Sequence, residues 1–185
     1  MRNNRHRFKL GMAIGGVLTA LALTPGAASA ECDGGGVSSA EVDICTPTAK
    51  GRLLENGMLV APKAAPPRVK AVIAAANRIR TKPYIFGGGH ARWWDKGYDC
   101  SGSVSFALHG GSFLESPLPS GPMAKLGLPG EGRWITVYSN PGHAYAVIAG
   151  FRWDTSGNTD GTTGPSWHED LRTPAGFVAR HPAGF

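Results

Sequence analysis

The centre of the chain reads GYDCSGSVSFALHGG over residues 97–111. Small and apolar side chains recur at helical spacing after Cys100, and either Gly110 or Gly111 can end the helix. Cys100 therefore lies where a loop becomes a helix. Unpaired backbone N–H groups at a helix N-terminus favour negative charge, and together with an imidazolium they lower a thiol pKa from about 8.5 to roughly 3.5–7.5. We expect a nucleophile here, because a buried structural cysteine more often lies on the apolar stripe of a helix.

A nucleophilic cysteine needs a general base, and a histidine is the usual one. His143 opens the run HAYAVIAGF, in which small and large apolar residues alternate as in a strand, directly after a predicted turn at residues 139–142. Asp154 follows eleven positions later, in FRWDTSG. If a strand turn brings FRWD back beside HAYAV, Asp154 can orient the imidazole of His143 through its second nitrogen. The alternative is an ordinary turn aspartate before residues 155–157.

The segment before the cysteine is predicted to contain a helix and a long loop. The helix is PPRVKAVIAAANRIR, residues 66–80, with apolar residues at helical spacing and Pro67 suited to the first turn. The loop YIFGGGHARWWDKGYD, residues 84–99, is rich in glycine and aromatic side chains, and it places His90 ten positions before Cys100. Two further strands are expected, at residues 133–138 and at residues 177–178.

Residues 1–30 have the composition of a secretory signal peptide. Residues 1–10 carry four basic side chains and no acid, residues 11–24 are apolar or small, and Ala28-Ser29-Ala30 provides a cleavage site. The apolar run is shorter than the roughly 20 residues that a membrane-spanning helix needs. We therefore expect a mature chain that begins at Glu31, has no transmembrane anchor and is secreted or held in the cell envelope.

Removal of the signal peptide changes the charge of the chain. The full sequence has 19 Lys and Arg against 13 Asp and Glu, and the signal peptide holds four of these bases. The remaining 15 bases and 13 acids leave a net charge of +2, which gives no support for nucleic-acid binding. The mature length of 155 residues suits one domain, and we expect a monomer.

Export also bears on the three cysteines. Outside the cytoplasm paired cysteines tend to oxidise, and Cys32 and Cys45 lie 13 positions apart in a glycine-containing stretch. A disulfide between them would tie down an N-terminal segment or linker at residues 31–66 and would leave Cys100 as a free thiol, although other pairings remain open. A single cysteine with scattered histidines lacks the spacing of a zinc site, so we expect no metal and no cofactor.

Three segments resemble the NlpC-type family of papain-like cysteine peptidases, which are bacterial cell-wall endopeptidases. They are PYIFGGG at residues 83–89, GYDCSGSVSFAL at 97–108 and GHAYAVIAG at 142–150, and the match covers roughly residues 66–154. The resemblance implies an α+β, papain-like domain over residues 67–185, in which the nucleophile helix packs on an antiparallel β-sheet that carries the histidine. It also implies hydrolysis of stem-peptide bonds in bacterial peptidoglycan.

The resemblance assigns roles to individual residues. Cys100 matches the nucleophile and His143 the base, and Asp154 is the nearest candidate for the third polar residue. The substrate-binding residues are expected to be Asp99 and Ser101, which match positions that hold the free amino end of the stem peptide, and Tyr84 at the edge of the site. Apart from the resemblance, the place of His90 in the loop just before Cys100 predicts that it also lines the site.

Two other functions remain open. A CHAP-type amidase would cut the sugar–peptide amide with a similar Cys–His pair, but Asp99 before the cysteine and Ser101 after it favour the endopeptidase. A non-catalytic wall-binding protein would retain the fold without turnover, and an unpaired, reactive Cys100 argues against it. The chain also departs from the family pattern, since Phe86 stands where Trp is commoner and residues 90–94 lengthen the loop. A reshaped substrate groove is therefore expected.

Overall fold

The structure of the protein is a computed structural model that describes residues 50–185. The predicted signal peptide and the predicted Cys32–Cys45 disulfide lie outside the described residues. Within residues 50–185 no helix is both long and apolar enough to cross a membrane. The helices are α1 (Pro67–Ile79), α2 (Cys100–Gly110) and α3 (Ser120–Met123). The strands are β1 (Arg52–Leu53), β2 (Leu59–Val60), β3 (Leu128–Pro129), β4 (Ile135–Asn140), β5 (His143–Ile148), β6 (Phe151–Asp154), β7 (Ser166–His168) and β8 (Val178–His181).

The larger sheet has six strands in the order β3-β8-β4-β5-β6-β7, and all neighbouring pairs are antiparallel. β4 begins and ends two residues later than the strand predicted at 133–138, because it continues to Asn140, which pairs with His143. The predicted turn therefore shrinks to the two residues between these strands. A second tight hairpin, with Gly150 at a φ of 79°, returns β6 beside β5. A contact between Asp154 and His143 requires this antiparallel pairing of β6 with β5.

The predicted first helix is present as α1. It begins at Pro67, where a missing N–H costs nothing because the first turn has no helical acceptor for it. One face of α1 packs on α2, and Gly110 allows the close approach, since a Cβ there would collide with the Cβ of Ala75. The buried apolar residues of α1 are Val69, Val72, Ile73, Ala75, Ala76 and Ile79.

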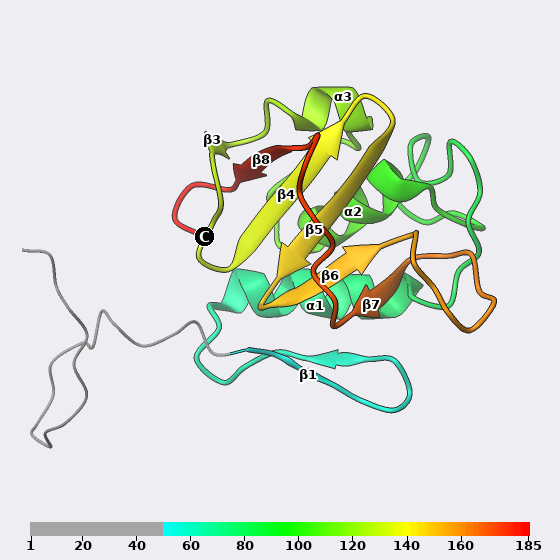
Figure 1. Ribbon diagram of the computed structural model, residues 1–185, viewed down its shortest axis with the longest axis horizontal. Helices are drawn as coiled ribbons and strands as arrows, with labels where there is room; N and C mark the ends of the chain where they lie inside the picture. Colours follow the sequence, from blue (N-terminus) through cyan, green and yellow to red (C-terminus); the bar gives the residue numbers. More distant parts are fainter. Residues whose placement is uncertain (1–49) are drawn as a thin grey trace, which may run out of the picture. The chain divides into compact units, whose positions relative to one another are not determined.

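Helix α2 is buried on every side, from Cys100 to Leu108. The sequence predicted a single apolar stripe, but the helix contacts both α1 and the sheet, so its serine face is covered as well. Ser103 Oγ donates to the Cys100 carbonyl at 2.8 Å, and the Trp153 indole donates to the Ser103 carbonyl at 3.2 Å. Figure 1 shows α1 and α2 behind the larger sheet, on the same side of it. The predicted α+β class, with the cysteine helix packed on an antiparallel sheet that carries the histidine, is confirmed.

Residues 50–66 pack against the rest of the described domain, whereas the sequence predicts that they belong to a preceding segment or linker. β1 and β2 form a small antiparallel sheet, and Leu59 is buried in the core. The buried Asn77 amide donates to the Leu59 carbonyl at 2.8 Å, accepts from the Leu59 N–H at 2.9 Å and accepts from the Trp167 indole at 2.9 Å. One polar side chain thus joins β2, α1 and β7. The domain start at residue 67 stays a prediction.

Candidate active site

Cys100 is the first residue of α2 and is 9% exposed. The residue before it, Asp99, caps the helix: its Oδ1 accepts the backbone N–H of Gly102 at 2.7 Å. Gly102 lies against the glycine-rich loop, and a Cβ at this position would collide with the carbonyl oxygen of Gly88. The cap and the glycine contact together hold the cysteine at the start of the helix.

His143 and Asp154 meet across the β5–β6 hairpin. Ala146 lies opposite Trp153, so continuing the register places Asp154 opposite Tyr145, two residues along β5 from His143. Side chains two residues apart on a strand share a face, and diagonal neighbours are within reach of long side chains. The imidazole Nε2 of His143 donates to Asp154 Oδ1 at 2.8 Å. The other ring nitrogen, Nδ1, is therefore left for the thiol.

The three groups shift one another's pKa values. Burial raises the pKa of the Cys100 thiol, but the His143 imidazole and the backbone N–H of Ala144 outweigh burial, and the pKa lies below its ordinary value. Burial lowers the pKa of His143, but Asp154 and the thiol raise it to about 9. Burial raises the pKa of Asp154, but His143 and Arg152 lower it to about 2. These directions favour the thiolate–imidazolium form of the pair over the neutral thiol and imidazole.

Asp154 is fully buried, at 0% exposure, and its carboxylate is satisfied on both oxygens. Besides His143, Oδ1 accepts the backbone N–H of Ser156 at 3.1 Å. Oδ2 accepts from Arg152 at 2.6 Å and from Arg172 at 3.1 Å. A buried carboxylate is tolerated only with such partners. Sequence reasoning missed both arginines; Arg152, two residues from Asp154 in a predicted strand, could have been found by its shared face, whereas Arg172 carried no local signal.

Arg172 also borders the histidine through aromatic rings. Its guanidinium lies 5.4 Å from the centroid of the Tyr145 ring and 5.5 Å from that of Phe177. The Phe177 ring in turn packs edge-on against the His143 ring, with centroids 6.2 Å apart. The His143 imidazole therefore packs against Phe177, and the same Phe177 ring contacts the half-buried Arg172 guanidinium.

Asp99, His90 and Ser101 form a second polar group beside the cysteine, here called the Asp99 cluster. His90 Nε2 lies 3.0 and 3.1 Å from the two Asp99 oxygens and 3.2 Å from Ser101 Oγ. Ser101 Oγ donates to Asp99 Oδ1 at 3.2 Å, and the backbone N–H of Gly87 donates to Oδ2 at 3.1 Å. With Gly102 at its cap position, the Asp99 carboxylate already has a donor on each oxygen.

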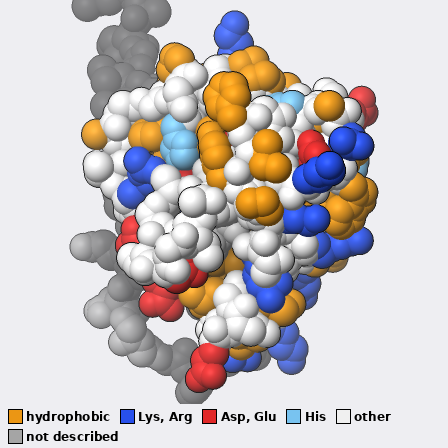
Figure 2. Space-filling model, turned by 90° about the vertical axis from the view of Figure 1, so that its right-hand side faces the viewer, with side chains coloured by type: hydrophobic (Ala, Val, Ile, Leu, Met, Phe, Trp, Pro, Cys, Tyr) orange, Lys and Arg blue, Asp and Glu red, His pale blue; other side chains and the backbone are white. Residues whose placement is uncertain are grey.

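The segment of Tyr84 borders this region and exposes large apolar side chains. Tyr84 forms an isolated β-bridge with Tyr98, two residues before Cys100. Burial raises the pKa of the Tyr84 phenol, and the charges of Cys100 and Asp99 raise it further. Tyr84 is 38% exposed, and Phe86, two residues later, is 90% exposed. Figure 2 shows hydrophobic side chains gathered in the upper middle of one face of the molecule, beside a histidine.

The structure thus brings the sequence-predicted residues into two groups around one thiol. Cys100, His143 and Asp154 form the first group, and the Asp99 cluster forms the second. Within residues 50–185 no group of three or more His, Cys, Asp and Glu side chains is arranged to hold a metal ion. The arrangement of the first group is suited to nucleophilic attack by sulfur.

No model of a protein family matches the chain. No curated protein sequence matches it either. Among solved structures it is similar to the peptidoglycan hydrolase RipB from Mycobacterium tuberculosis, with 23% identity, a TM-score of 0.48, and coverage of 62% of this chain and 64% of that one. A hypothetical invasion protein of the same organism matches with 20% identity, a TM-score of 0.45 and 61% coverage of both chains. The chain therefore spans less than two thirds of the length of these two proteins.

A third neighbour is RipD from Mycobacterium tuberculosis, which is described as a non-catalytic NlpC/p60 domain protein adapted to peptidoglycan binding. It has 20% identity and a TM-score of 0.48, and the match covers 63% of this chain and 98% of that one. Its NlpC/p60 family is the one that the three sequence segments around Cys100 and His143 resemble.

Proposed function

We propose that the chain is a secreted peptidoglycan endopeptidase that hydrolyses stem-peptide bonds. The observation that carries the proposal is the Cys100 group: a thiol of lowered pKa at a helix N-terminus, beside an imidazole that the buried Asp154 orients. Such a group performs acyl transfer to sulfur. The choice of peptidoglycan rests on the resemblance of the three sequence segments to NlpC-type peptidases.

The reaction proceeds in two steps. The Cys100 thiolate attacks the carbonyl carbon of the scissile amide, and the C–N bond breaks as the His143 imidazolium gives its proton to the leaving amine. Water then attacks the thioester, His143 takes a proton from that water, and the acid product leaves as the thiolate returns. Asp154 keeps the imidazole oriented and stabilises its positive charge in both steps.

The first turn of α2 supplies the oxyanion site in this mechanism. The N–H groups of the first turn have no acceptor within the helix, and the Asp99 side chain occupies that of Gly102. Ser103 donates its N–H to the Asp99 carbonyl, so the N–H groups of Cys100 and Ser101 are the ones left without an acceptor among the described residues and free to bind the oxyanion. Preorganised donors of this kind contribute strongly to acyl transfer.

The Asp99 cluster and Tyr84 would contact the substrate next to the thiol. Both oxygens of Asp99 already accept hydrogen bonds, so an ammonium group of the stem peptide would compete for this carboxylate with His90 and Ser101. We therefore assign the direct contacts to His90, Ser101 and Tyr84, with Asp99 holding the first two in position.

The test uses the purified full chain and its Cys100→Ala variant on defined muropeptides, with products read by mass spectrometry. New stem-peptide fragments that require Cys100 would support the endopeptidase, and their masses would name the bond. Release of an intact stem from the glycan would instead support the CHAP-type amidase. Binding of muropeptides by both proteins without any product would support a non-catalytic wall-binding protein. N-terminal sequencing of secreted protein tests the start at Glu31.

A further inference from the structure

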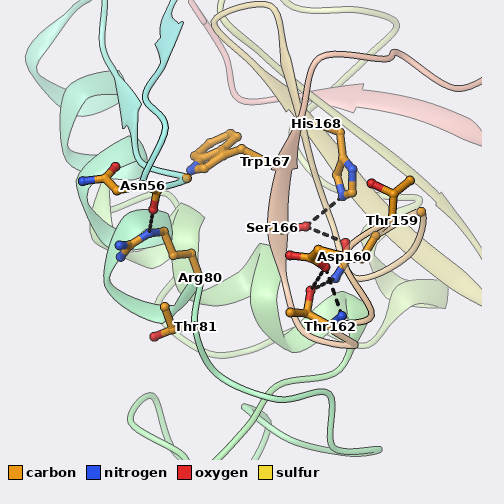
Figure 3. Close-up of a pocket in the computed structure, with 12 residues that line it drawn as sticks. Asn56, Arg80, Thr81, Thr159, Asp160, Thr162, Ser166, Trp167 and His168 are labelled. Atoms are coloured by element: carbon orange, nitrogen blue, oxygen red, sulfur yellow. Dashed lines mark hydrogen bonds between the residues drawn. The ribbon is translucent and has the colours of Figure 1, made fainter.

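A cavity of about 410 Å³ lies away from Cys100 and His143, and none of the residues assigned above to the reaction lines it. Its volume falls within the range of about 300–1,000 Å³ that is usual for small-ligand sites. Figure 3 shows Arg80, Asn56 and Thr81 on one side of it and Thr159, Asp160 and Thr162 on the other, with Trp167 between them. We refer to it as the Arg80 cavity.

The two walls carry opposite charges that have no ion-pair partner within residues 50–185. Arg80 uses Nε and Nη1 to donate to the backbone carbonyls of Asn56 and Asn77, at 3.2 and 3.0 Å. Asp160 uses Oδ1 to accept from the N–H and hydroxyl of Thr162, at 3.0 and 2.6 Å. Each charged group is thus oriented by neutral partners, while Arg80 Nη2 and Asp160 Oδ2 have no hydrogen bond to any described residue.

The walls are held in place by contacts of their own. Asn158 Nδ2 donates to the Gly164 carbonyl at 3.0 Å, and Ser166 Oγ donates to Asn158 Oδ1 at 2.6 Å. Gly164 packs so closely on the preceding wall that a Cβ there would collide with the Lys82 carbonyl oxygen. The loop that carries Asp160 is therefore fastened to the segment that follows Arg80. A site whose walls are ordered before binding loses less entropy when it takes up a ligand.

A second cavity, of about 300 Å³, shares Arg80, Thr81 and Thr162 with the first and extends along Lys82 to Pro83. The Pro83 carbonyl accepts the backbone N–H of Tyr98 at 3.1 Å, and Tyr98 lies two residues before Cys100. The second cavity therefore extends from the Arg80 cavity toward the segment that leads into Cys100. A substrate bound at the thiol can extend along this path.

We propose that the Arg80 cavity binds a zwitterionic α-amino-acid group of the substrate, with the carboxylate on Arg80 and the ammonium on Asp160. A group that carries both charges on one carbon matches two opposed and oriented charges better than a simple cation or anion, since either of those leaves one wall unpaired. The inference rests on the proposed function, because a stem peptide whose diamino acid is diaminopimelate ends that side chain in such a zwitterion.

The test measures binding to the full chain carrying Cys100→Ala, so that no probe is cleaved. The probes are a stem tripeptide with meso-diaminopimelate at its third position and the same tripeptide with lysine there, which lacks the side-chain carboxylate. We expect the lysine peptide to bind about tenfold more weakly or worse, as for loss of a hydrogen bond to a charged group. Arg80→Met should remove this preference, and Asp160→Asn should weaken both peptides.

Two controls make the result specific. Arg78→Met removes an exposed arginine in the last turn of α1, two residues before Arg80, that lies over Trp94 and does not line the cavity. This variant should leave both affinities unchanged. Asp160→Asn keeps the size and the Thr162 contacts of the aspartate, so it tests the charge even if Arg80→Met unfolds the chain. Equal binding of the two peptides by the parent protein, or unchanged binding in both variants, would overturn the inference.

The origin of the zwitterion and the proposed function are tested separately. Free meso-diaminopimelate that binds as tightly as the tripeptide would support the same chemistry with a free amino acid as ligand. Cleavage of muropeptides by the parent chain is a different measurement. A preference for the zwitterion without cleavage would leave the cavity assignment standing and remove the endopeptidase, and cleavage without the preference would do the reverse.

Discussion

Two histidine–aspartate pairs flank the same thiol, and they differ in how each carboxylate is held. Asp154 is fully buried at the end of a strand, with two arginines on one oxygen and His143 on the other. Asp99 caps a helix and contacts His90 with both oxygens. In the first pair the aspartate and the thiol together raise the pKa of the histidine to about 9. The same two residue types therefore form a buried pair held by arginines in one place and a helix cap that also contacts a histidine in the other.

Replacing each histidine by alanine should separate the two pairs most sharply. His143→Ala removes the proton carrier, and we expect kcat/KM on a muropeptide to fall by about 10³-fold or more. His90→Ala should act mainly on KM, by about tenfold, because it removes a substrate contact and leaves the thiol and its base. His181→Ala, at the far end of β8, is the matched control and should change neither constant. Equal losses of kcat/KM in His143→Ala and His90→Ala would contradict the assignment of the base to His143 and of a substrate contact to His90.

The aspartate of the first pair should control the pH range of the reaction. Activity needs the thiolate and the imidazolium, so it rises as the lowered pKa of Cys100 is passed and is lost as pH rises through about 9, where His143 deprotonates. In Asp154→Asn we expect kcat to fall by about 10²-fold or more, and the alkaline limb of kcat/KM to move to lower pH, because the carboxylate no longer favours the imidazolium. An alkaline limb that stays near pH 9 in this variant would sink the assignment.

Arg172 should have a smaller effect, through Asp154. Arg172→Met removes one donor from Oδ2 and the cation beside Tyr145 and Phe177, and we expect kcat to fall about tenfold. Arg172→Lys retains the charge and should recover part of this loss. The measurement is kcat with its pH profile, beside the thermal unfolding midpoint. A loss of unfolding temperature with kcat unchanged would mean that the arginine serves only stability.

The smallest effect is expected at the helix cap. Asp99→Ala should lower the free energy of unfolding by about 1 kcal/mol or more, because it removes the cap and the contacts with Gly87 and His90. Asp99→Asn should lower it less, because asparagine also caps helices well and loses only the acceptor for the Gly87 N–H. Urea denaturation of both variants measures the difference. A loss in Asp99→Asn as large as that in Asp99→Ala would mean that the charge itself, rather than the cap, is what α2 requires.

The helix and strand that carry Cys100 and His143 could be predicted because their signals are local. Pro67 marks the start of α1, the segment DCSG marks the start of α2, and the alternation after His143 marks β5. The fully buried environment of α2 could not be predicted, because its serines look like a polar face until α1 and the sheet cover them. The sequence predicts a role for Asp154 only if β6 forms a hairpin with β5, and the tight turn at Gly150 provides that hairpin.

By itself the sequence determined that Cys100 begins a helix and that His143 opens a strand, since caps, glycine turns and strand alternation act over a few residues. Only the tertiary structure decided which charges meet. Arg172 reaches Asp154 because β7 returns beside β6 and carries the following residues back toward that strand. Arg80 and Asp160 share a cavity because the loop between β6 and β7 lies beside the end of α1. Contacts between such distant segments depend on register and packing, and no short stretch of sequence encodes them.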